Sequence, residues 1–316
     1  MLPFAFVFPG QGSQSVGMLD AWGDHPVVAQ TLTEASDALG VDVGLLIKNG
    51  PAEALALTTN TQPVMLVASI AAYRVWIAET GALPAMLAGH SLGEYSALVA
   101  SGVLTLTQCV PLVRFRAQAM QNAVPVGMGA MAAILGMTSD KVIEGCQEAL
   151  ASFSAGTTEV VEAVNFNDPL QTVIAGSKAA VDKACEVLKS NGAKRALLLA
   201  VSAPFHSSLM MPAAEALREK LASVAFAAPA IPVINNIDVA IESDSDRIRA
   251  ALYRQAFGPV RWVESVRAMK ARGVVNLVEC GPGKVLAGLI RRIDPEMTGL
   301  PLFDLASMAQ VKETLA

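Results

Sequence analysis

The sequence has few residues of the types that build metal centres and disulfide frameworks. Its 316 residues include only four cysteines, which lie far apart without a CxxC pair, and only three histidines. This spacing argues against a zinc knuckle or a disulfide network, and it fits a protein of the reducing cytoplasm. At this length the hydrophobic core needs neither kind of support.

Long apolar runs and clusters of basic residues are also missing. The longest apolar stretches, such as "VMLVASIAAY" at 64–73, fall well short of the ~20 residues that cross a bilayer. The opening "MLPFAFVFPG" lacks the basic region and cleavage site of a signal peptide, and it predicts a buried strand. The formal net charge of −5 comes without basic runs, so neither nucleic acid nor a membrane is an expected partner. We expect a small-molecule or protein substrate.

Short apolar runs alternate with longer helical patterns along most of the chain. Strands are predicted at 4–8, 84–88, 231–235 and 274–279, and helices at 61–79, 92–101 and 108–122. Glycines at 81 and 102 end the first two of these helices. This alternation predicts an α/β fold with a largely parallel sheet, of the α/β-hydrolase-like kind.

The segment 128–202 departs from this rhythm. It predicts a strand at 130–135, a helix at 139–151, strands at 160–166 and 171–176, a helix at 178–190 and a strand at 194–201. The order βαββαβ is that of a ferredoxin-like unit. We therefore expect a small domain, 128–202, inserted into a large catalytic domain formed by 1–127 and 203–316. Ligand pockets tend to form at such domain boundaries.

The pentapeptide "GHSLG" at 89–93 follows a predicted strand and precedes a predicted helix. Strand, sharp turn and helix are the context of a nucleophile elbow, in which Ser91 would project its hydroxyl outward. A serine at this place can also be an ordinary helix cap. The pentapeptide by itself does not decide between the two.

A nucleophilic serine needs a base, and the histidines offer few choices. His90 adjoins Ser91, so its side chain is expected to leave the turn in another direction and to play a structural part. His25 precedes Pro26 at a helix start and is expected at the surface. His206, where the chain leaves the small domain, is the best candidate by elimination, although a lone histidine after a strand is often structural.

Nine segments, taken in order, resemble the malonyl-CoA:acyl-carrier-protein transacylases of fatty-acid synthesis. The resemblance runs through nearly the whole chain, and the nine together are far more specific than any one of them. They are "VFPGQGSQ" at 7–14, "GHSLGEYSAL" at 89–98, "RFRAQAMQ" at 114–121, "GAMAAILG" at 129–136, "VNFNDPLQTVIAG" at 164–176, "APFHSSLM" at 203–210, "PVINNID" at 232–238, "RQAFGPVRW" at 254–262 and "ECGPGKVLAGLIRR" at 279–292.

The resemblance implies a ping-pong acyl transfer without a cofactor. Ser91 would take the malonyl group from malonyl-CoA with His206 as general base, and the phosphopantetheine thiol of acyl carrier protein would then accept it. It implies that the backbone N–H groups of Gln11 and Leu92 form the oxyanion hole. The histidine would be oriented by the backbone carbonyl of Gln255 rather than by a carboxylate. Asp168, before a proline, is expected to cap a loop.

The resemblance also assigns residues to the acyl pocket. Arg114 and Arg116 both lie in the predicted helix 108–122, and helical periodicity does not choose between them. The family pattern R-x-x-x-M-Q selects Arg116 as the carboxylate-binding group, a task that suits a planar, permanently charged guanidinium. Phe205 would narrow the pocket against branched acyl groups, with ordinary core packing as its alternative. Asn165 and Gln62 are expected to help line the cleft.

Two other classes of function share some of these features. A serine esterase or thioesterase would use the same elbow, and a noncatalytic carrier-binding module could keep the fold without the reaction. Within the acyltransferase class, the carrier could belong to a polyketide pathway. A cytoplasmic monomer is expected, and basic residues are the candidates for docking the acidic carrier: Lys194, Arg195, Lys284 and Arg291.

Overall fold

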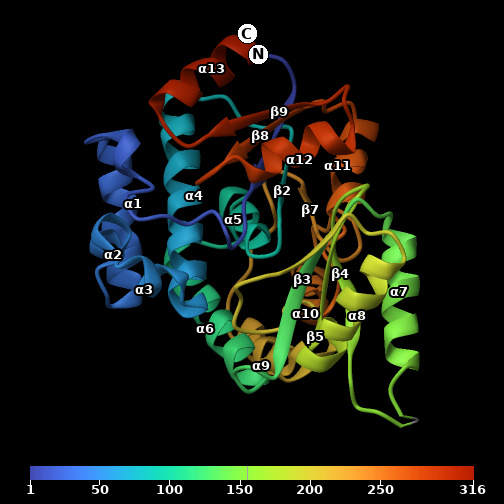
Figure 1. Cartoon of the computed structure of the whole chain (residues 1–316). Coiled ribbons are helices and arrows are strands. Elements are labelled where there is room, and N and C mark those ends of the chain that lie inside the picture. The colour runs from blue at the N-terminus through green and yellow to red at the C-terminus, as the bar shows by residue number, and fades with distance from the viewer. Residues whose placement is uncertain (155) are drawn as a thin grey trace.

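A computed structural model describes residues 1–154 and 156–316, and it contains two sheets covered by helices (Figure 1). The larger, sheet A, has the strand order β7-β2-β1-β8-β9, and its neighbouring strands are all parallel. The smaller, sheet B, has the order β4-β5-β3-β6 and is antiparallel. The predicted fold class, a mostly parallel sheet with a smaller ferredoxin-like unit, is confirmed.

Sheet A is short-stranded and deeply buried. Every residue of four of its strands is buried, as expected for parallel strands that are covered on both faces. The fifth strand lies at an edge, is partly exposed and was not predicted. The strands are β1 (Phe4–Phe8), β2 (Met86–Gly89), β7 (Val233–Ile234), β8 (Asn276–Cys280) and β9 (Thr298–Leu302).

Helices cover both faces of sheet A because its side chains alternate between them. Phe4, Phe6 and Phe8 of β1 join one core cluster, whereas Ala5 and Val7 join another on the opposite face. No helix in the described ranges 1–154 and 156–316 is long and apolar enough to cross a membrane. The helices of this larger part are α1 (Pro26–Leu39), α2 (Val43–Asn49), α3 (Ala52–Ala56), α4 (Thr58–Thr80), α5 (Gly93–Ala100), α6 (Leu106–Ala123), α9 (Met211–Ala222), α10 (Ser245–Phe257), α11 (Trp262–Ala271), α12 (Val285–Ile293) and α13 (Leu305–Leu315), with short 3-10 helices η1 (Asp20–Trp22) and η2 (Ser208–Met210).

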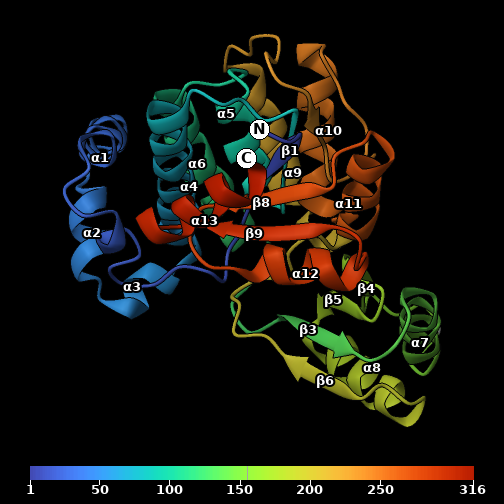
Figure 2. The same ribbon diagram turned by 90° about the horizontal axis from the view of Figure 1, so that it is seen from above.

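Sheet B and its two helices form the smaller unit, to one side of sheet A (Figure 2). Its elements follow the predicted order: β3 (Gly129–Leu135), α7 (Ser139–Ala151), β4 (Val161–Asp168), β5 (Gln171–Ser177), α8 (Lys178–Ser190) and β6 (Arg195–Leu198). Strand β6 is shorter than predicted: Leu199 still donates to the Met131 carbonyl of β3 at 2.9 Å, and Leu199 and Val201 line a cavity instead of continuing the strand. The domain limits at 127/128 and 202/203 stay a prediction.

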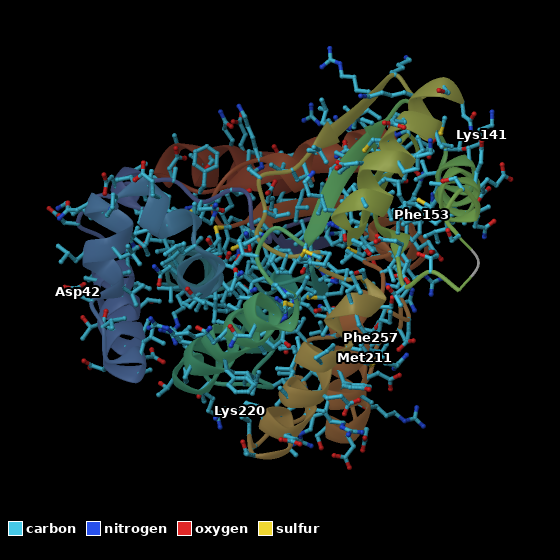
Figure 3. The ribbon with its side chains drawn as sticks, turned by 60° about the horizontal axis from the view of Figure 1, so that its bottom comes forward. Asp42, Lys141, Phe153, Met211, Lys220 and Phe257 are labelled. Atoms are coloured by element: carbon cyan, nitrogen blue, oxygen red, sulfur yellow. The ribbon has the colours of Figure 1, made fainter. Side chains whose placement is uncertain are left out.

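The two faces of sheet B have different neighbours. One face packs against α7 and α8, through a cluster that includes Ala132, Ile134 and Ile174. The other face carries Met131 and Val173 and packs against half-buried Phe205, which follows the small unit in sequence. In Figure 3, Lys141 and Phe153 mark the outer end of this unit and Asp42 lies at the opposite end of the molecule. Sheet B thus turns its open face toward the segment that carries His206.

Candidate active site

The turn between β2 and α5 holds Ser91 in a strained conformation. Its φ angle is +53°, in the left-handed region that a residue with a side chain rarely adopts. The flanking glycines are needed because a Cβ on Gly89 would lie 1.8 Å from the carbonyl carbon of Gly93, and one on Gly93 would lie 2.1 Å from the oxygen of Phe8. This close strand-turn-helix packing has the geometry of a nucleophile elbow.

His206 lies beside this serine. Its Nε2 atom is 2.6 Å from Ser91 Oγ, and its Nδ1 atom is 2.9 Å from the carbonyl oxygen of Gln255 and 3.2 Å from that of Gly258. Since a carbonyl only accepts, Nδ1 carries the proton and Nε2 is free to accept the serine proton. Burial and, next, the charge of Arg116 lower the pKa of His206 to about 3. The ring is therefore neutral at pH 7.

Arg116 reaches the same point from α6. It is 2% exposed, and its Nη2 atom donates to Ser91 Oγ at 3.3 Å and to Gln255 Oε1 at 3.1 Å. Its Nη1 atom donates to Gln62 Oε1 at 2.8 Å, so both ends of the guanidinium are held. Arg114 is half-buried and does not line the cavity at Ser91. A fixed cation beside a hydroxyl is suited to bind a carboxylate close to the reacting atom.

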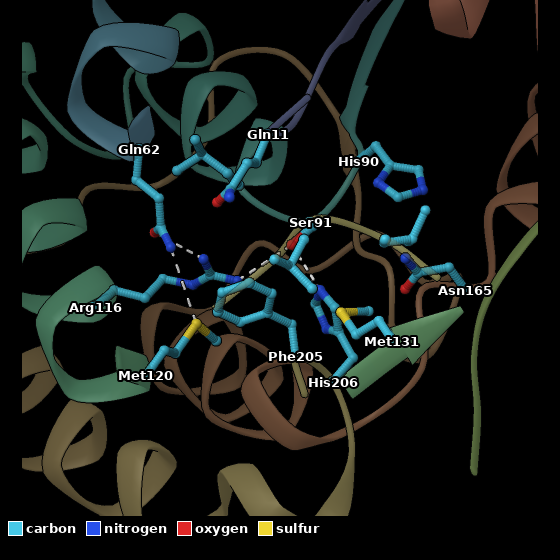
Figure 4. Close-up of a pocket in the computed structure, with 13 residues that line it drawn as sticks. Gln11, Gln62, His90, Ser91, Arg116, Met120, Met131, Asn165, Phe205 and His206 are labelled. Atoms are coloured by element: carbon cyan, nitrogen blue, oxygen red, sulfur yellow. Dashed lines mark hydrogen bonds between the residues drawn. The ribbon is translucent and has the colours of Figure 1, made fainter. Parts of the chain in front are cut away.

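One cavity joins these groups (Figure 4). The predicted residues Gln62, Asn165 and Phe205 all line it. Asn165 comes from β4, and its Oδ1 atom is buried without a hydrogen-bond partner in the part of the chain that the structure describes. The remaining wall is largely apolar: Met120, Met131, Leu199 and Val201. The cavity therefore combines one cation and one nucleophile with walls that suit a short acyl chain.

The residues expected at the oxyanion hole also border the cavity. Gln11 lies in the loop after β1, where its side chain donates to Thr58 Oγ1 at 3.3 Å, and Leu92 directly follows Ser91. Within residues 1–154 and 156–316, the backbone N–H groups of Gln11 and Leu92 donate to no protein acceptor. Two free amides next to a nucleophile are what a developing oxyanion requires. The role itself stays a prediction.

The structure adds an asparagine that the sequence did not single out. The Oδ1 atom of fully buried Asn236 accepts the N–H of Ser91 at 2.7 Å, and its Nδ2 atom donates to the Gly89 carbonyl at 2.6 Å. These two bonds stabilise the strained turn through its backbone. Asn236 lies within the segment "PVINNID" that carried the resemblance, but nothing in that pattern indicates a contact with the distant elbow.

Gln255 contributes its side chain as well as its predicted carbonyl. While its main-chain oxygen orients His206, its Nε2 atom donates to the Ser91 carbonyl at 3.0 Å and to Glu94 Oε2 at 2.9 Å. Its Oε1 atom accepts from Arg116. One buried glutamine therefore contacts the nucleophile, the base and the cation, and this amide network was not predicted.

The other titratable candidates lie outside the reacting group. His90 points away from Ser91, and its Nε2 atom is 2.8 Å from Asn167 Oδ1. Asp168 caps the loop before Leu170 and forms an ion pair with Arg292 at 2.9 Å. His25 was expected at the surface, but its side chain is only 14% exposed because it caps α1 and contacts Glu79.

The four basic docking candidates do not line the cavity. Lys194 and Arg195 stand at the start of β6, whereas the cavity is reached by Leu199, beyond its other end. Lys284 precedes α12, and Arg291 lies in its last turn. Their docking role stays a prediction.

Comparison with known proteins agrees with this geometry. The family model described as "Acyl transferase domain" matches residues 5–293. The malonyl CoA-acyl carrier protein transacylase of Escherichia coli (strain K12) is 52% identical over 314 residues, with 99% of this chain and 100% of the relative covered.

Solved structures extend the similarity to the fold. The crystal structure of acyl-carrier-protein S-malonyltransferase from Burkholderia pseudomallei 1710b is 61% identical with a TM-score of 0.95, and the match covers 99% of this chain and 100% of that one. A malonyl-transacylase in complex with a type II polyketide acyl-carrier protein is 47% identical with a TM-score of 0.95, over 99% of each chain. By its family model and its relatives, this chain belongs to the acyl transferase family and, within it, to the malonyl CoA-acyl carrier protein transacylases.

Proposed function

We propose that this protein transfers the malonyl group of malonyl-CoA to the phosphopantetheine thiol of acyl carrier protein, through an ester on Ser91. One observation carries the proposal. The Ser91 hydroxyl lies 2.6 Å from the unprotonated nitrogen of His206 and 3.3 Å from the buried guanidinium of Arg116. A nucleophile, a base and a cation that can bind a carboxylate therefore lie close enough together to contact one malonyl group.

In the first half-reaction Ser91 attacks the thioester. Its proton moves to His206 Nε2 as Oγ forms a bond to the malonyl carbonyl carbon, and the carbonyl oxygen becomes an oxyanion. The N–H groups of Gln11 and Leu92 are the donors for this oxyanion, and each such donor typically contributes about 3 kcal/mol. The C–S bond then breaks, His206 returns the proton to sulfur, and coenzyme A leaves as the thiol.

In the second half-reaction the direction is reversed. The carrier's phosphopantetheine thiol gives its proton to His206 and attacks the Ser91 ester. When the C–O bond breaks, the proton returns to Oγ and restores the free serine. The carbonyls of Gln255 and Gly258 hold the imidazole in the required tautomer throughout both steps.

Arg116 serves selectivity and also influences the base. Its guanidinium can bind the malonyl carboxylate, which acetyl lacks, so the extra contact exists only for the malonyl donor. In the free protein the charge of Arg116 contributes to the lowered pKa of His206. A carboxylate bound to Arg116 offsets that charge, so we expect malonyl binding to make His206 a stronger base.

The remaining cavity residues complete the acyl pocket. Gln62 holds Arg116 in place, while the ring of Phe205 and the side chains of Met120 and Met131 limit the space for an α-branch. Asn165, from the smaller unit, lines the cavity, and its Oδ1 atom has no hydrogen-bond partner among the described residues. The proposal includes no cofactor, and the cytoplasmic monomer remains an expectation.

A second candidate differs only in the carrier. The solved relative that holds a type II polyketide carrier protein makes a polyketide pathway the alternative to fatty-acid synthesis. Transfer rates to purified fatty-acid and polyketide carriers, compared at equal concentration, separate the two. We expect the fatty-acid carrier to be the better acceptor.

The proposal is tested by measuring the products from malonyl-CoA with and without the phosphopantetheinylated carrier. We expect malonyl-carrier to form only with the modified carrier, and free malonate to form slowly when the carrier is omitted. Rapid release of malonate in either case would identify a thioesterase and overturn the proposal. Absence of any Ser91 adduct would leave only a carrier-binding module.

A further inference from the structure

A buried carboxylate next to the elbow has no part in the proposed reaction. Glu94, the second residue of α5, is 2% exposed. Its Oε2 atom accepts the backbone N–H of Asn236 at 2.8 Å and the Nε2 amide of Gln255 at 2.9 Å. A carboxylate placed this deep is costly unless its charge is compensated.

The side-chain amide of Gln255 links this carboxylate to Arg116. Its Nε2 end donates to Glu94, and its Oε1 end accepts from Arg116 Nη2 at 3.1 Å. An anion on one side and a cation on the other admit only this orientation of the amide. The carboxylate and the guanidinium are therefore two hydrogen bonds apart, with a polarised amide between them.

The groups that contact Arg116 directly are neutral. Its hydrogen-bond partners Gln62, Gln255 and Ser91 carry no charge, and its guanidinium lies 5.4 Å from the centre of the Tyr95 ring. Loss of hydration lowers the pKa of Arg116, and the nearby Tyr95 and Glu94 groups oppose this by raising it. A buried cation is far more stable with such an anion near it.

We propose that Glu94 is the counter-charge of Arg116 when no malonyl group is bound. Through the Gln255 amide, Glu94 competes with the malonyl carboxylate for the positive charge of Arg116. Glu94 thereby sets how tightly malonyl donors bind, without touching them. It is a positioning and specificity residue. The inference rests on the proposed malonyl transfer.

Malonyl binding should be coupled to protonation of Glu94. A bound malonyl carboxylate brings a second anion to Arg116, so the protonated form of Glu94 is favoured in the complex. Burial raises the pKa of Glu94 to about 7 in the free protein, and malonyl binding should raise it further. Binding of a malonyl donor should therefore be accompanied by proton uptake at Glu94 near neutral pH. The KM of malonyl donors should increase as the pH rises.

Few other charges face Glu94. Asp238 and Glu242, between β7 and α10, approach it from one side, and each is near an arginine: Arg254 at 2.5 Å and Arg247 at 3.6 Å.

Strands β1 and β2, which pack against α5, contain no ionisable side chain. Helix α6 carries the half-buried Arg114 and the buried Cys109 thiol besides Arg116, and burial keeps the pKa of Cys109 high. Helix α4, also against α5, carries Tyr73, Arg74 and Glu79; Tyr73 has its pKa raised by burial, Arg74 pairs with Glu34, and Glu79 contacts His25.

The test compares Glu94→Gln with the matched variant Glu242→Gln, because Glu242 lines the same small cavity as Glu94. KM and kcat for Ser91 acylation are measured with malonyl-CoA and acetyl-CoA from pH 5.5 to 8.5. We expect E94Q to lower the malonyl KM about tenfold at high pH and to remove its pH dependence. Acetyl KM should be unchanged, and E242Q should behave as the wild type.

Proton uptake provides a measurement that needs no variant. In weakly buffered solution near pH 7, acylation of the wild type by malonyl-CoA should take up more protons than acylation by acetyl-CoA. If E94Q does not fold, the difference in proton uptake between the two donors tests the role of Glu94 by itself. Equal uptake from the two donors, or equal changes of both KM values in E94Q, would overturn the role of Glu94. A wild type that does not prefer malonyl would instead overturn the proposed function.

Discussion

The two units of the molecule contribute to the cavity in different ways. The unit built on sheet A supplies Ser91, His206 and Arg116, and several hydrogen bonds hold each of them. The unit built on sheet B supplies Met131, Asn165 and two further apolar residues as a wall. The reacting atoms therefore depend on one unit, and the shape of the acyl pocket depends on both.

Backbone hydrogen bonds connect the two units on the side of the base. Val260, five residues after Gln255, donates to the Val164 carbonyl at 2.8 Å and accepts from the Phe166 N–H at 3.0 Å. These bonds connect β4 to the segment that orients His206. Because the units differ in this way, changes at Ser91 and His206 in the first unit should reduce kcat, whereas changes in the wall from the second unit should mainly alter KM.

The largest effect is expected at the nucleophile. Ser91→Ala removes the atom that carries the acyl group, so acylation by malonyl-CoA should fall at least about 10⁴-fold. Intact-protein mass spectrometry after mixing with malonyl-CoA measures it. A normal yield of the adduct in this variant would place the acyl group elsewhere.

Loss of the base should have the next largest effect. His206→Ala leaves the serine without its proton acceptor, and kcat should fall on the order of 10²–10⁴-fold, because this is the usual contribution of a general base. The rate of coenzyme A release in a single turnover gives the value. An unchanged rate would remove the imidazole from the mechanism.

Removal of the cation should separate the two donors. Arg116→Ala should reduce kcat/KM for malonyl-CoA by about 10²–10³-fold, as for a truncated buried charge pair, and acetyl transfer should fall far less. Arg114→Ala is the matched control, since Arg114 lies on the same helix outside the cavity. Equal losses with both donors would refute a carboxylate-binding role.

The smallest effect is expected in the wall from sheet B. Asn165→Ala removes one neutral polar contact, worth about 0.5–1.5 kcal/mol, so the malonyl KM should rise a few-fold at constant kcat. Steady-state kinetics separate the two constants. A fall in kcat comparable with that of His206→Ala would contradict the division between the units.

Local patterns predicted most of the architecture because the strands of sheet A are apolar runs between helical segments. The βαββαβ order was also visible in the alternation of periods along 128–202. Strand β9 was not predicted, since "TGLPL" is short, contains a proline and lies at an edge. Its parallel pairing with β8 defines it, and no local pattern indicates that pairing.

The candidate site was predictable where chemistry limits the choice. Because the sequence has only three histidines, there were few candidates for the general base. The resemblance selected Arg116 over Arg114. The network of Glu94, Asn236 and the Gln255 side chain was not predictable, because Asn236 and Gln255 lie 142 and 161 residues from Glu94 in sequence. Amides and a buried glutamate occur in many roles, and only their packing behind Ser91 assigns one.

The most direct measurement of the central claim is the fate of the malonyl group in a single turnover. After mixing with malonyl-CoA, the wild type should gain the mass of one malonyl group on the peptide that contains Ser91, and it should lose that mass when phosphopantetheinylated carrier is added. An adduct on another residue, or loss of the group to water at the same rate without the carrier, would contradict the account.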